Sequence, residues 1–302
     1  VIALLAPGQG SQTEGMLSPW LELPGAADQL ALWSKASGLD LVRLGTTAST
    51  EEITDTAVTQ PLVVAATLLA HQELTKRRLF AGEELVVAGH SVGEIAAYAI
   101  AGVLGADDAV ALAATRGAEM AKACATEPTG MSAVLGGDEA EVLGRLEQLD
   151  LFPANRNATG QIVAAGALTA LEKLAEDPPA KARVRALGVA GAFHTKYMAS
   201  ALDGYAAAAA AISTAEPTAT LLSNRDGKAV ASAAAAMDAL VAQLTQPVRW
   251  DLCTATLREH DVKAIVEFPP AGTLAGIAKR ELRGVPTRAV KSPADLDELA
   301  DI

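Results

Sequence analysis

Gly89-His90-Ser91-Val92-Gly93 follows the apolar run Leu85-Val86-Val87-Ala88 and precedes an alanine-rich helical pattern that begins at Glu94. A strand that turns sharply into a helix presents its turn residue at the carboxyl end of the sheet, beside the positive end of the helix. Glycines two positions before and after the serine remove β-carbons that would collide where strand and helix cross. The pattern therefore predicts a nucleophile elbow with Ser91 at its apex, although an ordinary turn is the alternative for these five residues.

The rest of the chain alternates strand-like apolar runs with long helical patterns, which is typical of a mostly parallel sheet covered by helices. The apolar runs are residues 1–6, 85–88, 218–222 and 264–268. The helical patterns are residues 62–74, 107–123, 198–212 and 250–260. With the elbow at the end of one strand, we expect a hydrolase-like fold of the α/β class.

The pattern changes after Cys124, where the sequence Thr-Glu-Pro-Thr-Gly at residues 126–130 breaks the helix. The next segment predicts a strand, a helix, two strands, a helix and a strand, at residues 131–135, 138–148, 152–156, 161–165, 168–176 and 182–187. This βαββαβ order is typical of a ferredoxin-like unit. We therefore expect a large catalytic domain at residues 1–125 and 191–302, an inserted subdomain at residues 126–190, and an active site in the cleft between them.

Composition and charge exclude several classes of function. The 302 residues are 50% hydrophobic, yet no apolar segment approaches the roughly 20 residues that span a bilayer. A formal net charge of −12 and only 3% aromatic residues argue against nucleic acid binding. Residues 1–6 have no basic flank and are followed by Pro7-Gly8, so we expect a first strand, not a signal peptide, in a cytoplasmic protein without membrane contact. The four histidines show no metal-binding spacing, and we expect no metal.

A serine nucleophile needs a base, and His194 is the best candidate. It lies in Gly-Ala-Phe-His-Thr at residues 191–195, where the chain leaves the predicted subdomain. His90 is adjacent to Ser91 but would point away from it. A structural histidine is the alternative for His194, and the residues alone do not decide between the two. Hydrolases place an acid between the serine and the histidine in chain order, but no acid stands out here.

Arg116 and Gln9 are two further candidates. Small residues flank Arg116 on the helical pattern, so its guanidinium could lie on a packed surface and bind a carboxylate; an arginine that extends to solvent is the alternative. Gln9 lies in the glycine-containing loop 7–12 after the first strand, where its N–H could contribute to an oxyanion hole. This loop lacks the spacing of a dinucleotide or Walker site, so a dinucleotide site is not expected.

Together these motifs resemble the malonyl-CoA:acyl carrier protein transacylase family of dissociated, type II fatty acid synthesis, over nearly the full length. The matching segments, in family order, are residues 8–12, 59–61, 89–94, 116–117, 157 with 160–163, 192–194 and 247–250. The resemblance implies an acyltransferase that moves a malonyl group from malonyl-CoA to the phosphopantetheine thiol of acyl carrier protein by a ping-pong mechanism through an acyl-serine. It implies no cofactor, since malonyl-CoA would be a substrate.

The resemblance also implies catalytic roles at the matching positions. Ser91 would be the nucleophile and His194 its base and acid. Arg116 would bind the malonyl carboxylate, and the main-chain N–H groups of Gln9 and Val92 would form the oxyanion hole.

Three more positions follow from the resemblance. The main-chain carbonyl of Gln243 would orient His194 where hydrolases use an acid, in agreement with the missing acid. Asn157 and the side chain of Gln9 would line the acyl pocket. Phe193 would select malonyl over branched acyl groups, because its ring would occupy the space that an α-methyl group needs; packing between the domains is the alternative.

Other functions are left open. A serine carboxylesterase or thioesterase could use the same elbow, the transfer could serve polyketide synthesis, and a scaffold that only binds the carrier could keep the fold. Arg116 separates a transferase from an esterase, because a hydrolase of neutral esters would not bury a cation there. Carrier docking could use any of three basic clusters: residues 76–78, residues 181, 183 and 185, or residues 279–280.

Overall fold

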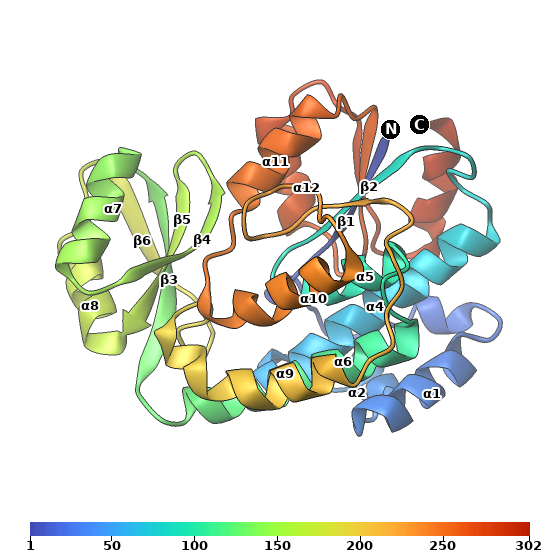
Figure 1. The fold of residues 1–302 in the computed structure, drawn as a ribbon, viewed down its shortest axis with the longest axis horizontal. Coiled ribbons are helices and arrows are strands. Elements are labelled where there is room, and N and C mark those ends of the chain that lie inside the picture. The colour runs from blue at the N-terminus through green and yellow to red at the C-terminus, as the bar shows by residue number, and fades with distance from the viewer.

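The computed structural model describes all 302 residues, and its larger part is built around a five-stranded sheet (Figure 1). The strand order is β7-β2-β1-β8-β9, and every neighbouring pair is parallel. The strands are β1 (Ile2–Ala6), β2 (Leu85–Gly89), β7 (Thr220–Leu221), β8 (Ala264–Glu267) and β9 (Thr287–Ala289). β1 and β8 are wholly buried, as continuous apolar runs are when helices cover both faces of a parallel sheet.

Helices cover the two faces of this sheet unequally. Ile2, Leu4 and Ala6 of β1 point into a core of 56 buried residues, which helices of the N-terminal half, together with α9 and α10, complete. These helices are α1 (Ala26–Ser37), α2 (Leu41–Thr46), α3 (Thr50–Thr54), α4 (Thr56–Lys76), α5 (Gly93–Ile100), α6 (Ala106–Cys124), α9 (Leu202–Ala210) and α10 (Ala233–Ala242). Ala3 and Leu5 point the other way, toward α11 (Trp250–Glu259) and α12 (Thr273–Glu281). The predicted α/β sheet with helices on both faces is confirmed.

The smaller part, at the left of Figure 1, has the predicted βαββαβ order. Its elements are β3 (Thr129–Gly136), α7 (Glu139–Gln148), β4 (Phe152–Ala158), β5 (Gln161–Ala167), α8 (Leu168–Glu176) and β6 (Ala182–Ala186). The sheet is antiparallel in the order β4-β5-β3-β6, and α7 and α8 pack on it to form a separate core. The unit lies inside the range 126–190, whose exact limits, like those of the large domain, stay a prediction.

Hydrogen bonds join the two parts beside the end of β2. The N–H of Arg156 in β4 donates to the carbonyl of Val248 at 2.9 Å, and the N–H of Val248 donates to the carbonyl of Ala154 at 2.8 Å. Nearby, the ring Nε2 of His90 lies 2.8 Å from Oδ1 of Asn157. The small sheet is therefore fastened to the large domain at Val248 and at His90, the residue before Ser91.

Some element boundaries differ from the sequence predictions. α4 begins at Thr56, six residues earlier than the predicted start at 62, because the side chain of Asp55 caps its first turn and the helix continues through Pro61. Residues 196–201 form the 3-10 helix η2 (Lys196–Ala201), and of the predicted helix 198–212 only residues 202–210 are α-helical. Three more 3-10 helices are η1 (Trp20–Glu22), η3 (Gln243–Thr245) and η4 (Pro293–Asp301). None of the helices combines the length and apolarity needed to cross a bilayer.

Candidate active site

Ser91 lies in a sharp turn between β2 and α5, as its sequence context predicts. Its φ of 55° is in the left-handed region, which non-glycine residues rarely adopt. A β-carbon on Gly89 would collide with the main chain of Gly93, and one on Gly93 would collide with the carbonyl oxygen of Ala6. The two glycines of the motif are therefore required by close main-chain contacts on both sides of the serine.

His194 is the residue that the fold brings to Ser91. Its Nε2 lies 2.8 Å from Ser91 Oγ, and its Nδ1 lies 2.8 Å from the main-chain oxygen of Gln243. A carbonyl oxygen only accepts, so Nδ1 carries the hydrogen and Nε2 is free to accept from the serine hydroxyl. No aspartate or glutamate contacts this ring, which agrees with the absence of a candidate acid in the sequence.

The surroundings of His194 keep its ring neutral. Burial lowers the pKa of His194 to about 3, and the positive charge of Arg116 acts in the same direction. A neutral ring with a free Nε2 can accept a proton from Ser91. The arrangement is thus a serine and a ready base, oriented by the main chain.

Arg116 is buried beside the two, with only 1% of its surface exposed. Its Nη2 donates to Ser91 Oγ at 3.3 Å and to Gln243 Oε1 at 2.8 Å, while Nη1 donates to Gln60 Oε1 at 2.8 Å. No carboxylate forms an ion pair with it, and its Nε has no partner. The side chain does not extend to solvent. A buried cation held by neutral amides next to the serine can bind a negatively charged substrate group.

The close approach of two helices explains why Arg116 is buried. A β-carbon on the neighbouring Gly117 would lie 2.8 Å from the carbonyl oxygen of Thr56, so α6 and α4 touch at this position. Gln60, on the next turn of α4, is brought beneath the guanidinium in this way. The sequence showed the small residues of α6 but not the helix that they contact.

Two main-chain N–H groups near Ser91 are free of internal hydrogen bonds. Those of Gln9 and Val92 donate to no group in the protein, whereas the N–H of Ser91 donates to Asn224 Oδ1 at 2.9 Å. Gly8 lies so close to the elbow that a β-carbon on it would be 2.7 Å from the His90 carbonyl oxygen, which places the Gln9 loop next to Ser91. These two N–H groups can stabilise a developing oxyanion.

The remaining predicted residues lie nearby with less distinctive contacts. Asn157 is buried and its Oδ1 contacts His90, not Ser91. The amide Nε2 of Gln9 is buried without a partner. Phe193 is buried in the main core, so its position suits both a selective role and plain packing.

Sequence analysis missed a buried polar network under the elbow, formed by Glu94 and Asn224. Asn224 Nδ2 donates to the carbonyl of Gly89 at 2.7 Å, and its own N–H donates to Glu94 Oε1 at 2.6 Å. Glu94 Oε2 accepts from Gln243 Nε2, also at 2.6 Å. Burial raises the pKa of Glu94, whereas these hydrogen bonds and the charge of Arg116 favour its ionised form, in which both oxygens accept as the contacts require. The only sequence signal was a glutamate in an otherwise apolar helix.

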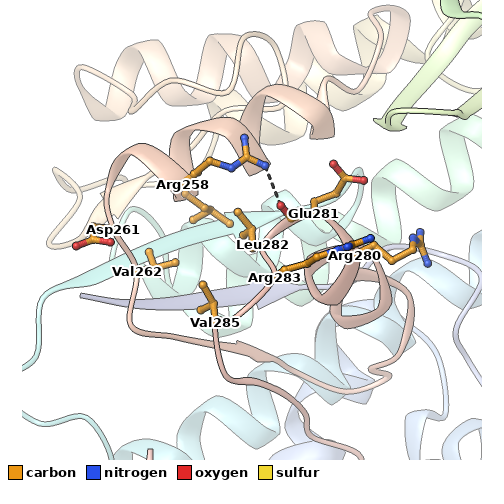
Figure 2. A pocket seen from close by; sticks show the side chains of 9 residues that line it. Arg258, Asp261, Val262, Arg280, Glu281, Leu282, Arg283 and Val285 are labelled. Atoms are coloured by element: carbon orange, nitrogen blue, oxygen red, sulfur yellow. Dashed lines mark hydrogen bonds between the residues drawn. The ribbon is translucent and has the colours of Figure 1, made fainter.

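The pocket shown in Figure 2 lies elsewhere and contains none of these residues. Its volume is about 540 Å³, and its lining includes Arg258, Arg280 and Arg283. Val262, also in the lining, precedes the first residue of β8, so the pocket lies at the edge of the parallel sheet opposite Ser91. Arg258 donates to the main-chain oxygen of Glu281 at 2.9 Å there.

No group of three or more His, Cys, Asp or Glu side chains in the protein is arranged to hold a metal ion. The expectation that the protein works without a cofactor nevertheless stays a prediction.

Comparison with known proteins gives consistent matches over the whole chain. Residues 4–294 match the family model of the acyl transferase domain. The chain is 86% identical, over the full length of both, to the malonyl CoA-acyl carrier protein transacylase of Mycobacterium tuberculosis. It is 34% identical to the enzyme of that name from Salmonella typhimurium, over 97% of each chain.

Solved structures agree with these matches. The crystal structure of MCAT from Mycobacterium tuberculosis superposes with a TM-score of 0.98 at 87% identity, over 99% of each chain. A malonyl-transacylase solved in complex with its type II PKS acyl-carrier protein superposes with a TM-score of 0.93 at 30% identity, again over 99% of each.

Proposed function

The chain belongs to the acyl transferase family, and from this membership we propose that it transfers the malonyl group of malonyl-CoA to the phosphopantetheine thiol of an acyl carrier protein, supplying fatty acid chain elongation. The observation that carries the choice of acyl group is Arg116, a buried cation without a carboxylate partner whose Nη2 lies 3.3 Å from Ser91 Oγ. Support for the reaction comes from malonyl CoA-acyl carrier protein transacylases that are 86% identical to this chain over its full length.

In the first half of the proposed reaction, Ser91 becomes acylated. His194 Nε2 takes the hydroxyl proton as Ser91 Oγ attacks the thioester carbonyl. The N–H groups of Gln9 and Val92 stabilise the oxyanion of the tetrahedral intermediate. The carbon–sulfur bond then breaks, and the coenzyme A thiolate takes the proton from His194, leaving a malonyl ester on Ser91.

The second half runs the same steps in reverse order with a different thiol. The phosphopantetheine thiol of the carrier gives its proton to His194 and attacks the ester carbonyl. The ester bond breaks, and Ser91 Oγ recovers the proton from His194. His194 is oriented by the Gln243 carbonyl, which has no negative charge to stabilise an imidazolium. Burial also holds the pKa of His194 far below its usual range, so the imidazolium exists only transiently during each half of the reaction.

The other site residues have proposed roles in holding the acyl group. Arg116 binds the malonyl carboxylate, and the Gln9 amide and Asn157 line the acyl pocket. Phe193 excludes an α-methyl substituent. Gripping the far end of the acyl group keeps the ester oriented for a thiol, which favours transfer over hydrolysis.

Two alternatives to malonyl transfer for fatty acid synthesis each rest on a specific observation. The same transfer could serve polyketide synthesis, since one structural relative was solved with a type II PKS acyl-carrier protein. A serine carboxylesterase or thioesterase would use the same Ser91 and His194, but it gives no role to a buried Arg116. The expected cytoplasmic location stays a prediction, because the relatives' names state none.

The deciding experiment is intact mass measurement after incubation with malonyl-CoA, with and without a holo carrier protein. We expect one malonyl adduct on the wild-type chain, none on Ser91→Ala, and discharge of the adduct only onto a carrier that has its phosphopantetheine. Free malonate in place of loaded carrier would make the protein a thioesterase. An adduct that persists in Ser91→Ala would remove Ser91 from the mechanism.

A further inference from the structure

The side chain of Gln243 connects Arg116 to Glu94. Its Oε1 accepts from Arg116 Nη2 at 2.8 Å, and its Nε2 donates to Glu94 Oε2 at 2.6 Å. The main-chain oxygen of the same residue orients His194, so this side chain contributes a second and separate function. All of these groups are buried, and water cannot readily replace a lost partner.

The direction in which the Gln243 amide points decides what Arg116 contacts. An amide has one donor end and one acceptor end, and a guanidinium can only donate. With Oε1 toward Arg116 the contact is favourable; with Nε2 toward it, two donors would face each other. The other hydrogen bonds of Arg116 go to Gln60 Oε1 and Ser91 Oγ.

Glu94 makes the shortest of three contacts at the donor end of that amide, since the Ser91 carbonyl oxygen and Asn224 Oδ1 each lie 3.1 Å from the same Nε2. Glu94 Oε1 accepts from the main-chain N–H of Asn224 at 2.6 Å while Oε2 accepts from Gln243. A carboxylate accepts at both oxygens, whereas a carboxamide of the same size accepts at one end only. Glu94 is 1% exposed and forms no ion pair. It therefore serves neither as a solvated surface charge nor as half of a salt bridge.

We propose that Glu94 is a positioning residue for acyl selection: it fixes the direction of the Gln243 amide, and the amide in turn holds the Arg116 guanidinium where the substrate carboxylate binds. This inference rests on the proposed malonyl transfer and deepens it. Glu94 does not touch the substrate. It acts on the choice of acyl group and not on the base, because His194 is oriented by the Gln243 main chain, which a change at Glu94 leaves in place.

The test is Glu94→Gln, which keeps the shape but forces one contact between two donors, either at Asn224 or at Gln243. We expect the ratio of kcat/KM for malonyl-CoA over acetyl-CoA to fall roughly tenfold, within the one to two decades that a charge-assisted bond to a carboxylate supplies. The loss should appear mainly in KM for malonyl-CoA. A glutamate that serves only the fold would slow both substrates equally and leave the ratio unchanged.

A double-mutant comparison shows whether Glu94 acts through Arg116. In an Arg116→Ala background, Glu94→Gln should change the ratio no further. Glu267→Gln is the matched control, because Glu267 is equally buried and accepts main-chain N–H bonds from Gly272 and Ala275, but it has no hydrogen bond to Gln243 or Arg116. It should leave the ratio at the wild-type value.

A second variant covers the case in which Glu94→Gln does not fold. Gln243→Ala removes the connecting amide but keeps the main-chain oxygen, and it should lower the ratio to a similar degree. An unchanged ratio in the folded variants, a loss that persists without Arg116, or failure of both variants to fold would overturn the proposal. A wild-type chain that takes no malonyl adduct would instead refute the proposed function, and the role of Glu94 with it.

Discussion

On the reacting side of the site, a main-chain carbonyl orients the base, whereas on the acyl-binding side, side-chain amides orient Arg116. Ser91 and His194 both adopt left-handed backbone conformations, with φ of 55° and 61°, and the Gln243 carbonyl orients the ring. Arg116 is instead held by the side-chain amides of Gln60 and Gln243. Because a substitution changes side chains and not main-chain groups, we infer that acyl choice is easier to alter than the reaction itself.

The largest expected effect lies on the reacting side. His194→Ala should slow acylation by roughly 10²–10⁴-fold, the usual contribution of a general base, for malonyl-CoA and acetyl-CoA alike. Rapid-quench intact mass measures both rates. A loss below tenfold would mean that another group takes the proton, and a loss confined to one substrate would break the distinction between the two sides.

Arg116→Ala tests the acyl-binding side. The preference for malonyl over acetyl should fall by about one to two decades, because a charge-assisted hydrogen bond is worth roughly 1.5–3 kcal/mol. Acetyl transfer should decline less. Arg43→Ala is a suitable control, since Arg43 pairs with Glu52 at the surface. Equal losses with both acyl groups would make Arg116 a structural residue.

Phe193→Ser tests how the acyl pocket selects against branched acyl groups. We expect methylmalonyl-CoA to gain on malonyl-CoA by roughly tenfold, at the lower limit of the 10–200-fold that one methyl group changes in a tight pocket. The ring is buried, so the variant could also lose about 3 kcal/mol of stability, and the ratio of kcat/KM must be measured on folded protein. An unchanged ratio would assign Phe193 to packing alone.

Changes at the surface that binds the carrier, away from the reacting and acyl-binding sides of the site, should have a weaker effect on activity, and this effect should depend on salt. Arg77 is paired with Glu73 and Asp297, whereas no ion pair involves Arg183 or Arg185 on β6. Reversing the charges of Arg183 and Arg185 should raise KM for the carrier, most at low salt, while acylation by malonyl-CoA is unaffected. If KM of the variant for the carrier stayed at the wild-type value at both low and high salt, this strand would be excluded from docking.

The smallest expected effect is that of pH. A solvent-exposed histidine titrates at about pH 6.5, but burial lowers the pKa of His194 to about 3, so its ring is already neutral in mildly acidic solution. The acylation rate should therefore be nearly constant between about pH 5 and 7. A pH profile with a break near 6.5 would show that His194 is not held neutral by its surroundings.

The strands and the elbow could be predicted because their signals are local. β1 and β2 are continuous apolar runs, β8 is one up to its last residue, Glu267, and the glycines of the elbow lie two positions before and after Ser91. The βαββαβ unit was predictable for the same reason, since its strands and helices are short and clearly separated by turn residues.

The partners of Arg116 and the network under Ser91 could not be predicted from composition or spacing. Glu94, Asn224 and Gln243 are far apart in the chain and meet only when α5, the loop after β7 and η3 pack together. Whether Arg116 is buried depends on the contact of Gly117 with α4, which no pattern within α6 reveals. The Gln243 carbonyl was expected only through resemblance, because every residue has one.

The junction between the two sheets has a consequence for how water is kept from the acyl-serine. Two main-chain bonds between β4 and Val248, and the contact of Asn157 with His90, fasten the small domain directly beside the elbow. Movement of the small domain away from the elbow would break these contacts, so we expect this domain to keep its position during turnover. We then expect the malonyl group itself to exclude water. Fixed at its far end, it occupies the volume that a hydrolytic water would need.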